Sequence, residues 1–161
     1  MKRALTLLCI FAAFACSAAV VRLASNFIWD GPPSANSLRA VKGRPVVLLI
    51  AKSTHVRAFK AQVKVLREIF QEFASRKVIF AAALADGSTD ILSDIPFVLV
   101  KDGAQIATDY SVNGEFNIVI IGRDGNVDYQ TDRVIPASRV RDVVANSFVE
   151  QTDRRQEVAP Q

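Results

Sequence analysis

The feature that most constrains the fold is a set of three long apolar runs separated by polar segments. They read PVVLLIA at 45–51, KVIFAAALA at 77–85 and FNIVIIG at 116–122. Apolar runs of this length, without polar alternation, are typical of strands buried on both faces, as in a parallel or mixed sheet. The three runs therefore predict a sheet that is covered by helices on each side.

The polar segments between and after these runs predict the covering helices. Between the first two runs, apolar residues recur at spacings of three and four, at Phe59, Val63, Leu66, Phe70 and Phe73. This spacing predicts one amphipathic helix of about four turns, which makes a right-handed βαβ unit with the strands on either side of it. A last helix is expected to begin at Pro136, because proline is favoured at the first helical position.

Shorter elements complete the expected order. PFVLV at 96–100 predicts a short strand, and AQIATDY at 104–110 fits a short helix or the return strand of a hairpin, of which we favour the helix. The turn RDGN at 123–126 leads into VDYQTD, expected to return antiparallel to the third run. The order β-α-β, then a variable middle, then β-β-α predicts an α/β fold with a central mixed β-sheet and helices on both faces.

The N-terminus has the pattern of a secretory signal. MKR is followed by an uncharged stretch from Ala4 to Val21, with small residues at its end. A positive start, an apolar middle and a small-residue exit are typical of export with cleavage, so the chain is expected to be periplasmic or secreted. An uncleaved membrane anchor and lipidation at Cys16 are the alternatives, and either would tether the N-terminus to a membrane.

Composition shifts divide the chain into four parts. Residues 1–21 are the signal peptide or anchor, and residues 22–43, which contain the breaker DGPP, are a linker. Residues 44–148 are the predicted folded domain, and residues 149–161 a polar C-terminal tail. The role of Arg154 and Arg155 in that tail stays open between a solvated segment and part of a partner surface.

Cysteine usage excludes a class of function. The only two cysteines, Cys9 and Cys16, both lie in the expected signal segment. The predicted domain therefore has no thiol, and neither thiol–disulfide exchange nor thiol peroxidase activity is expected of it. The formal net charge of +4 is too small and too evenly spread to indicate a nucleic-acid partner.

The order of elements and the stretch IATDYSVNGEFNIVIIGRDGNV at 106–127 resemble the second half of a thioredoxin, and VLREIFQEF resembles the end of its first long helix. The resemblance covers about residues 44–148, with an unmatched insertion near 87–102. It implies a thioredoxin-like fold. The two cysteines of the family's CxxC motif would fall near Val56 and Phe59, and its cis-proline near Phe116, so both halves of the redox site are missing.

A finer resemblance is to a cysteine-lacking branch of the thioredoxin-like superfamily, a domain of unknown function found in exported bacterial proteins and at the C-terminus of extracellular sushi-repeat proteins. The residues that carry it are GRPVVLLIA, GEFNIVIIGRDGNV and the tail DRRQE at 153–157. That branch has no established activity, so the resemblance implies a fold and leaves the function open.

The junction after the first run holds the candidate site residues, which are Lys52, Ser53, Thr54, His55 and Arg57. Hydroxyl and basic side chains at a helix start can bind an anion such as a carboxylate, sulfate or phosphate. The simpler interpretation is that Ser53 and Thr54 only cap the helix. His55 with Ser53 resembles a base and a nucleophile, yet no third group or nucleophile elbow accompanies them.

No metal or cofactor is expected. One histidine without a cysteine is too few ligands for zinc. The run DGNVD, with Asp124, Asn126 and Asp128, lacks the later glutamate of a calcium loop. The sequence thus favours a non-catalytic binding or structural module, whose partner is a protein or a small anionic ligand. The alternative is a non-thiol enzyme or anion-binding protein that uses residues 52–57.

Overall fold

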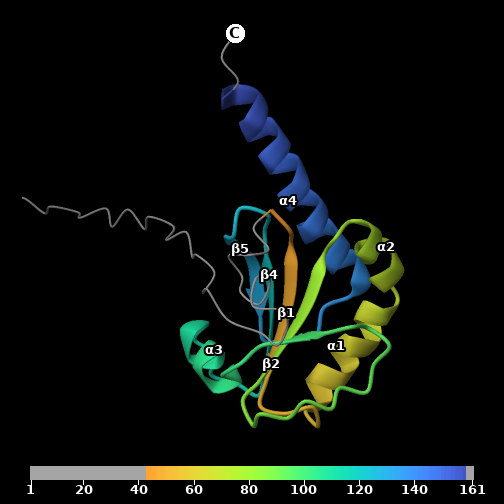
Figure 1. Ribbon diagram of the computed structural model, residues 1–161, viewed down its shortest axis with the longest axis vertical. Helices are drawn as coiled ribbons and strands as arrows, with labels where there is room; N and C mark the ends of the chain where they lie inside the picture. Colours follow the sequence, from red (N-terminus) through yellow and green to blue (C-terminus); the bar gives the residue numbers. More distant parts are fainter. Residues whose placement is uncertain (1–42, 159–161) are drawn as a thin grey trace, which may run out of the picture.

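A five-stranded sheet forms the centre of the molecule (Figure 1). The computed structural model describes residues 43–158, with side chains for residues 43–147. The strand order is β3-β2-β1-β4-β5. The strands are β1 (Val46–Ala51), β2 (Ile79–Leu84), β3 (Val98–Leu99), β4 (Phe116–Ile121) and β5 (Val127–Thr131).

The three apolar runs lie side by side as the three middle strands. β1 pairs parallel with β2 and antiparallel with β4, so that Val46 lies opposite both Ile79 and Ile121. Every residue of these three strands is buried. The outer pairs are β2 with β3, which is parallel, and β4 with β5, which is antiparallel. The expected mixed sheet is therefore confirmed.

Helices cover both faces, as predicted. On one face, α1 (Arg57–Arg67), α2 (Phe70–Ser75) and α4 (Ala137–Val158) pack against alternate strand residues such as Val47 and Leu49. On the other face, Ile106 and Tyr110, from α3 (Gly103–Asp109) and its C-cap, pack against the intervening residues such as Leu48. Each strand thus buries its odd and even side chains in different cores, and for this reason no polar alternation marks the sequence.

The long helix expected between the first two strands is broken. α1 ends at Arg67, and the amides of Glu68 and Ile69 bond to carbonyls three residues back rather than four. Such tightening rotates the chain, and Ile69 becomes buried. The second piece, α2, then places Phe70 and Phe73 beside Phe80 of β2, with ring centroids 5.8 and 6.2 Å away. The expectation of one continuous helix was wrong, because Phe70 and Phe73 reach Phe80 only after the chain has rotated relative to α1.

The variable middle contains a two-residue strand and a helix. The expected strand at 96–100 pairs only at Val98 and Leu99. The helical alternative for 104–110 is confirmed, since α3 spans Gly103–Asp109. Gly103 is required there, because a Cβ atom at this position would overlap the backbone of Leu84. The hairpin at 123–126 is also confirmed, with Gly125 at a φ of 86°.

The last helix is longer than expected. It continues to Val158, although the sequence analysis ended it at Phe148 and assigned a polar tail from residue 149. No proline or glycine interrupts Ala137–Val158, so nothing stops the helix before Pro160. In Figure 1 its C-terminal half extends beyond the sheet. Within residues 43–158, none of the helices is both long and apolar enough to cross a bilayer. The predicted signal peptide and nearly all of the linker lie outside the described residues.

Candidate functional site

The chain makes a turn between β1 and α1 before the helix starts. Val56 is the N-cap of α1, and no side chain bonds to the free amides of the first turn. The Ser53 hydroxyl accepts a hydrogen bond from the amide of His55 at 3.2 Å. The backbone amide of Val56 also bonds to the carbonyl of Ser53, at 3.4 Å. Ser53 and Thr54 therefore do not cap the helix, contrary to the simpler interpretation, because the turn delays its start to Arg57.

The five candidate residues point in different directions. The Lys52 amine lies 3.6 Å from the Glu115 carboxylate, and both groups are largely exposed. Arg57 lines a groove formed with the segments before β4 and after β5. Only Thr54 and His55 line the larger apolar cavity described next. Thr54 and His55 thus lie together at the cavity, whereas Lys52 and Arg57 lie on the side of Glu115, which lines the same groove as Arg57. The Ser53 hydroxyl stays beside the backbone of His55.

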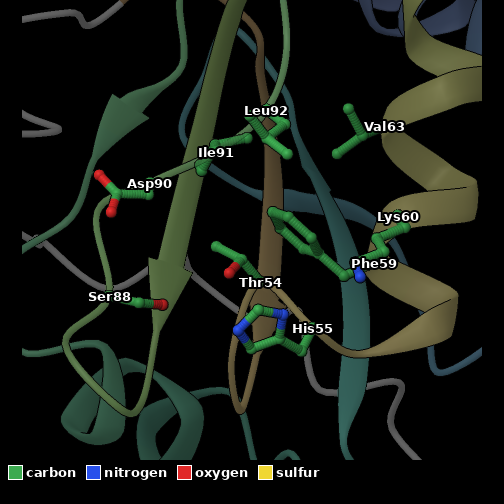
Figure 2. A pocket seen from close by; sticks show the side chains of 9 residues that line it. All are labelled: Thr54, His55, Phe59, Lys60, Val63, Ser88, Asp90, Ile91 and Leu92. Atoms are coloured by element: carbon green, nitrogen blue, oxygen red, sulfur yellow. The ribbon is translucent and has the colours of Figure 1, made fainter.

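We call this space the loop cavity, because one wall is the loop between β2 and β3. Its volume is about 570 Å³, within the usual range for small-ligand sites. Figure 2 shows its lining, which is formed by Thr54, His55, Phe59, Lys60, Val63, Ser88, Asp90, Ile91 and Leu92.

The lining has a polar end and an apolar end (Figure 2). Thr54, His55 and Ser88 lie at the lower end of the view, and Val63, Ile91 and Leu92 at the upper end, with the Phe59 ring between them. Leu92 is 99% exposed. Such an arrangement suits a molecule with one polar end and one apolar end.

A carboxylate outside the lining organises the polar end. Asp86 accepts hydrogen bonds from the amide of Ser88 at 2.9 Å and from its hydroxyl at 2.7 Å. These two bonds, with a smaller contribution from the charge of His55, lower the pKa of Asp86 below its ordinary value. Because Ser88 donates its hydroxyl proton to Asp86, His55 has no nucleophile hydrogen-bonded to it here. The geometry therefore does not form the relay of a serine hydrolase.

The loop from Asp86 to Ile95 is fixed at both ends. Asp86 and Ser88 make the turn at its start. Near its end, Arg67 of α1 forms an ion pair with Asp94, with a nitrogen–oxygen distance of 2.7 Å, and Ile95 is buried. Sequence reasoning treated this segment only as an insertion. The adjacent apolar pair Ile91–Leu92 within the polar stretch DGSTDILSD was the available signal.

A second hollow, which we call the α1 groove, lies on the other side of the start of α1. Its volume is about 520 Å³, and it is lined by Val56, Arg57, Ala58, Ala61, Gly114, Glu115, Phe116, Asp132 and Val134. The segment after β5, which forms one wall of this groove, is held by a buried side chain. The buried side chain of Gln62 accepts a hydrogen bond from the amide of Ile135 at 2.8 Å and donates one to its carbonyl at 3.1 Å.

The α1 groove brings together two of the three positions at which the thioredoxin resemblance expects redox-site residues; the third, Phe59, lines the loop cavity. Val56 stands at the start of α1 and Phe116 at the start of β4, and both line the groove. The described residues contain no cysteine and no cis peptide bond. The place that the resemblance assigns to redox chemistry is therefore lined by apolar and charged side chains.

Comparisons with known proteins agree with this arrangement at the level of the fold. No protein-family profile matches the chain, and no curated protein matches it in sequence. Among solved structures, one from Chlorobium tepidum, described as a thiol:disulfide interchange protein DsbE, is similar to this chain. The TM-score is 0.64 at 15% identity, and the match covers 79% of this chain and 96% of that one. The mitochondrial 2-Cys peroxiredoxin of Plasmodium falciparum gives 0.60 at 20% identity, covering 88% and 99%.

A third similar structure is BsSco, a member of the Sco family of cytochrome c oxidase assembly proteins, with a TM-score of 0.59 at 11% identity, covering 80% of this chain and 95% of that one. Identities this low carry the fold and not the activity. With its mixed sheet and its helices on both faces, the chain therefore has a thioredoxin-like fold.

Proposed function

We propose that this chain is an exported binding domain that uses a thioredoxin-like fold without thiol chemistry. The proposal is carried by the start of α1, at Val56 and Phe59, near which the resemblance expects the two cysteines of the family's motif. Phe59 is 2% exposed and packs into the core of the α1 face. That position therefore serves packing, whereas a redox site needs an accessible thiolate nearby.

The two hollows beside the start of α1 support a binding role. The α1 groove and the loop cavity each have a volume above 500 Å³, and each combines apolar walls with a few charged side chains. Pockets of this kind commonly bind a small molecule or receive part of a protein partner. The partner is accordingly a protein or a small anionic ligand. Membership in the cysteine-lacking branch named above is part of the same proposal and rests on the sequence resemblance alone.

Export is the second part of the proposal and depends on the N-terminal sequence. Cleavage near the small residues before Arg22 would release the domain to the periplasm or the medium, whereas retention of the segment or lipidation at Cys16 would tether it. The intact mass of protein recovered from membrane and soluble extracellular fractions measures which form exists. A full-length mass in the cytoplasmic fraction alone would overturn this part.

Insulin reduction and hydrogen peroxide consumption test the redox part. The full chain is assayed beside its Cys9→Ser/Cys16→Ser variant, and both are expected to stay at the rate of the reductant alone. Turnover by the full chain that the double serine variant abolishes would show thiol catalysis and defeat the proposal.

A variant with Val56→Cys and Phe59→Cys on the thiol-free background is the positive control. Residues three apart at a helix start are close enough for a disulfide, so we expect this variant to gain measurable insulin reduction. Circular dichroism establishes that it folds, because the truncated Phe59 leaves a cavity. A folded variant that forms no disulfide would show that the start of α1 is not the counterpart of the redox site.

A further inference from the structure

We propose that the loop cavity binds a small amphipathic carboxylate, with its apolar body against Phe59, Val63, Ile91 and Leu92 and its charged group near Lys60 and His55. The proposal deepens the binding role above and rests on it. It names the class of ligand and separates the loop cavity from the α1 groove.

The apolar end supplies the contact for the body of the ligand. Phe59 and Val63 lie one turn apart on α1, so they present adjacent side chains along one wall. Ile91 and Leu92 face them from the loop across the cavity (Figure 2). Each methylene that leaves water for such a surface strengthens binding about fourfold. A straight acyl chain of several carbons suits this wall.

Lys60 is the group that favours an anion. It lines the cavity from α1 and forms no ion pair with any of residues 43–147, and His55 lines the polar end. The first turn of α1 carries no acidic side chain. Two carboxylates lie nearby: Asp90 lines the cavity with its carboxylate turned away from the Phe59 ring in Figure 2, and Asp86, outside the lining, accepts both bonds from Ser88.

The hydroxyl groups add direction to the polar end. Ser88 already donates its proton to Asp86, so toward a ligand it can act only as an acceptor. Thr54 and Lys60 are left as the donors for a carboxylate, together with His55. A neutral alcohol would use the same apolar wall but would gain from Lys60 only a weaker hydrogen bond, without the attraction between opposite charges.

Isothermal titration tests this assignment with three probes of matched size, octanoate, octanol and octylammonium, and with acetate as the control that lacks the apolar chain. We expect octanoate to bind most tightly, octanol and octylammonium more weakly, and acetate not measurably. Equal binding of octanoate and octanol would show an apolar site without charge selection and overturn the proposal. Absence of octanoate binding at millimolar concentration would overturn it as well.

Three variants locate the bound octanoate. Lys60→Gln should weaken octanoate about tenfold and leave octanol unchanged, because only the charge-assisted contact is lost. Leu92→Ser should weaken both probes to a similar degree. Lys64→Gln, on the same helix but outside the lining, is the matched control and should change neither.

If Lys60→Gln and Lys64→Gln behave alike, the charge of Lys60 plays no part and the proposal fails. This outcome is independent of the insulin assay, so failure of the ligand assignment and failure of the non-redox role are distinguishable.

Discussion

Each of the two hollows beside α1 has one loop as a wall, and the two loops are held by different kinds of contact. The segment after β5 is fixed by Gln62, which is fully buried and bonds to both backbone groups of Ile135. The loop from Asp86 to Ile95 is fixed by the Asp86–Ser88 hydrogen bonds and by the Arg67–Asp94 ion pair. The side chains that make these contacts are exposed or half-exposed. Buried hydrogen bonds are costly to break, whereas exposed ion pairs contribute little. We therefore expect the wall of the α1 groove to be the rigid one and the wall of the loop cavity to be the adjustable one.

The largest expected effect on stability comes from removing the hydrogen bonds that hold the wall of the α1 groove. Gln62→Leu removes both hydrogen bonds and leaves the amide and carbonyl of Ile135 buried without partners, which costs about 2–5 kcal/mol of unfolding free energy. Urea denaturation measures this loss. Gln71→Leu, the same change at an exposed position of α2, is the control and should stay within about 0.5 kcal/mol of the natural chain. A loss below about 1 kcal/mol for Gln62→Leu would remove the contrast between the two walls.

Removing the ion pair that holds the wall of the loop cavity should lower the unfolding free energy much less. Arg67→Gln removes the pair with Asp94, whose two side chains are 55% and 69% exposed. We expect a loss of at most about 1 kcal/mol in unfolding free energy, because solvent screens such a pair. Hydrogen exchange should nevertheless accelerate at residues 91–95 and not at Ile135. Uniform acceleration across both loops would show that they open together.

A smaller effect is expected at the Asp86–Ser88 turn, where the loop that walls the loop cavity begins. Hydrogen bonds from Ser88 lower the pKa of Asp86. A lowered carboxyl pKa stabilises the fold above the pKa of the unfolded state, and this contribution is lost as the pH falls through the folded-state value. In Ser88→Ala the hydroxyl bond is gone, so the pKa of Asp86 should move up toward its ordinary value. Carbon-detected NMR titration of the Asp86 carboxyl measures the shift; an unchanged value would assign it to the backbone amide of Ser88 instead.

The smallest expected change in stability is at the rim of the loop cavity. Leu92→Ser alters a side chain that is 99% exposed, so the unfolding free energy should stay within about 0.5 kcal/mol of that of the natural chain. Thermal unfolding checks this. A marked loss would mean that Leu92 packs within the protein, and its availability to a ligand would then be in doubt.

The sequence predicted the scaffold better than the site because the two depend on different information. The runs at 45–51, 77–85 and 116–122 are apolar throughout, and that pattern alone indicates burial on both faces. The site residues share no such pattern. Proximity along the chain grouped the candidate residues into one site, yet Thr54 and His55 line the loop cavity. Arg57 lines the α1 groove together with Glu115, the partner of Lys52. Ser88 and Leu92 came from a loop more than 30 residues away and were missed.

By itself, the sequence determined the mixed sheet, the helices on both faces and the absence of a thiol from residues 43–158, because hydrophobic pattern and residue identity are local properties of the chain. Only the tertiary structure decided that α1 breaks at Glu68, that Gln62 bonds to Ile135 73 positions away, and that Thr54 and His55 face Ser88 and Leu92 across a cavity. These features depend on contacts between distant segments of the chain; the cavity, for example, forms where the sheet brings the carboxyl ends of β1 and β2 side by side.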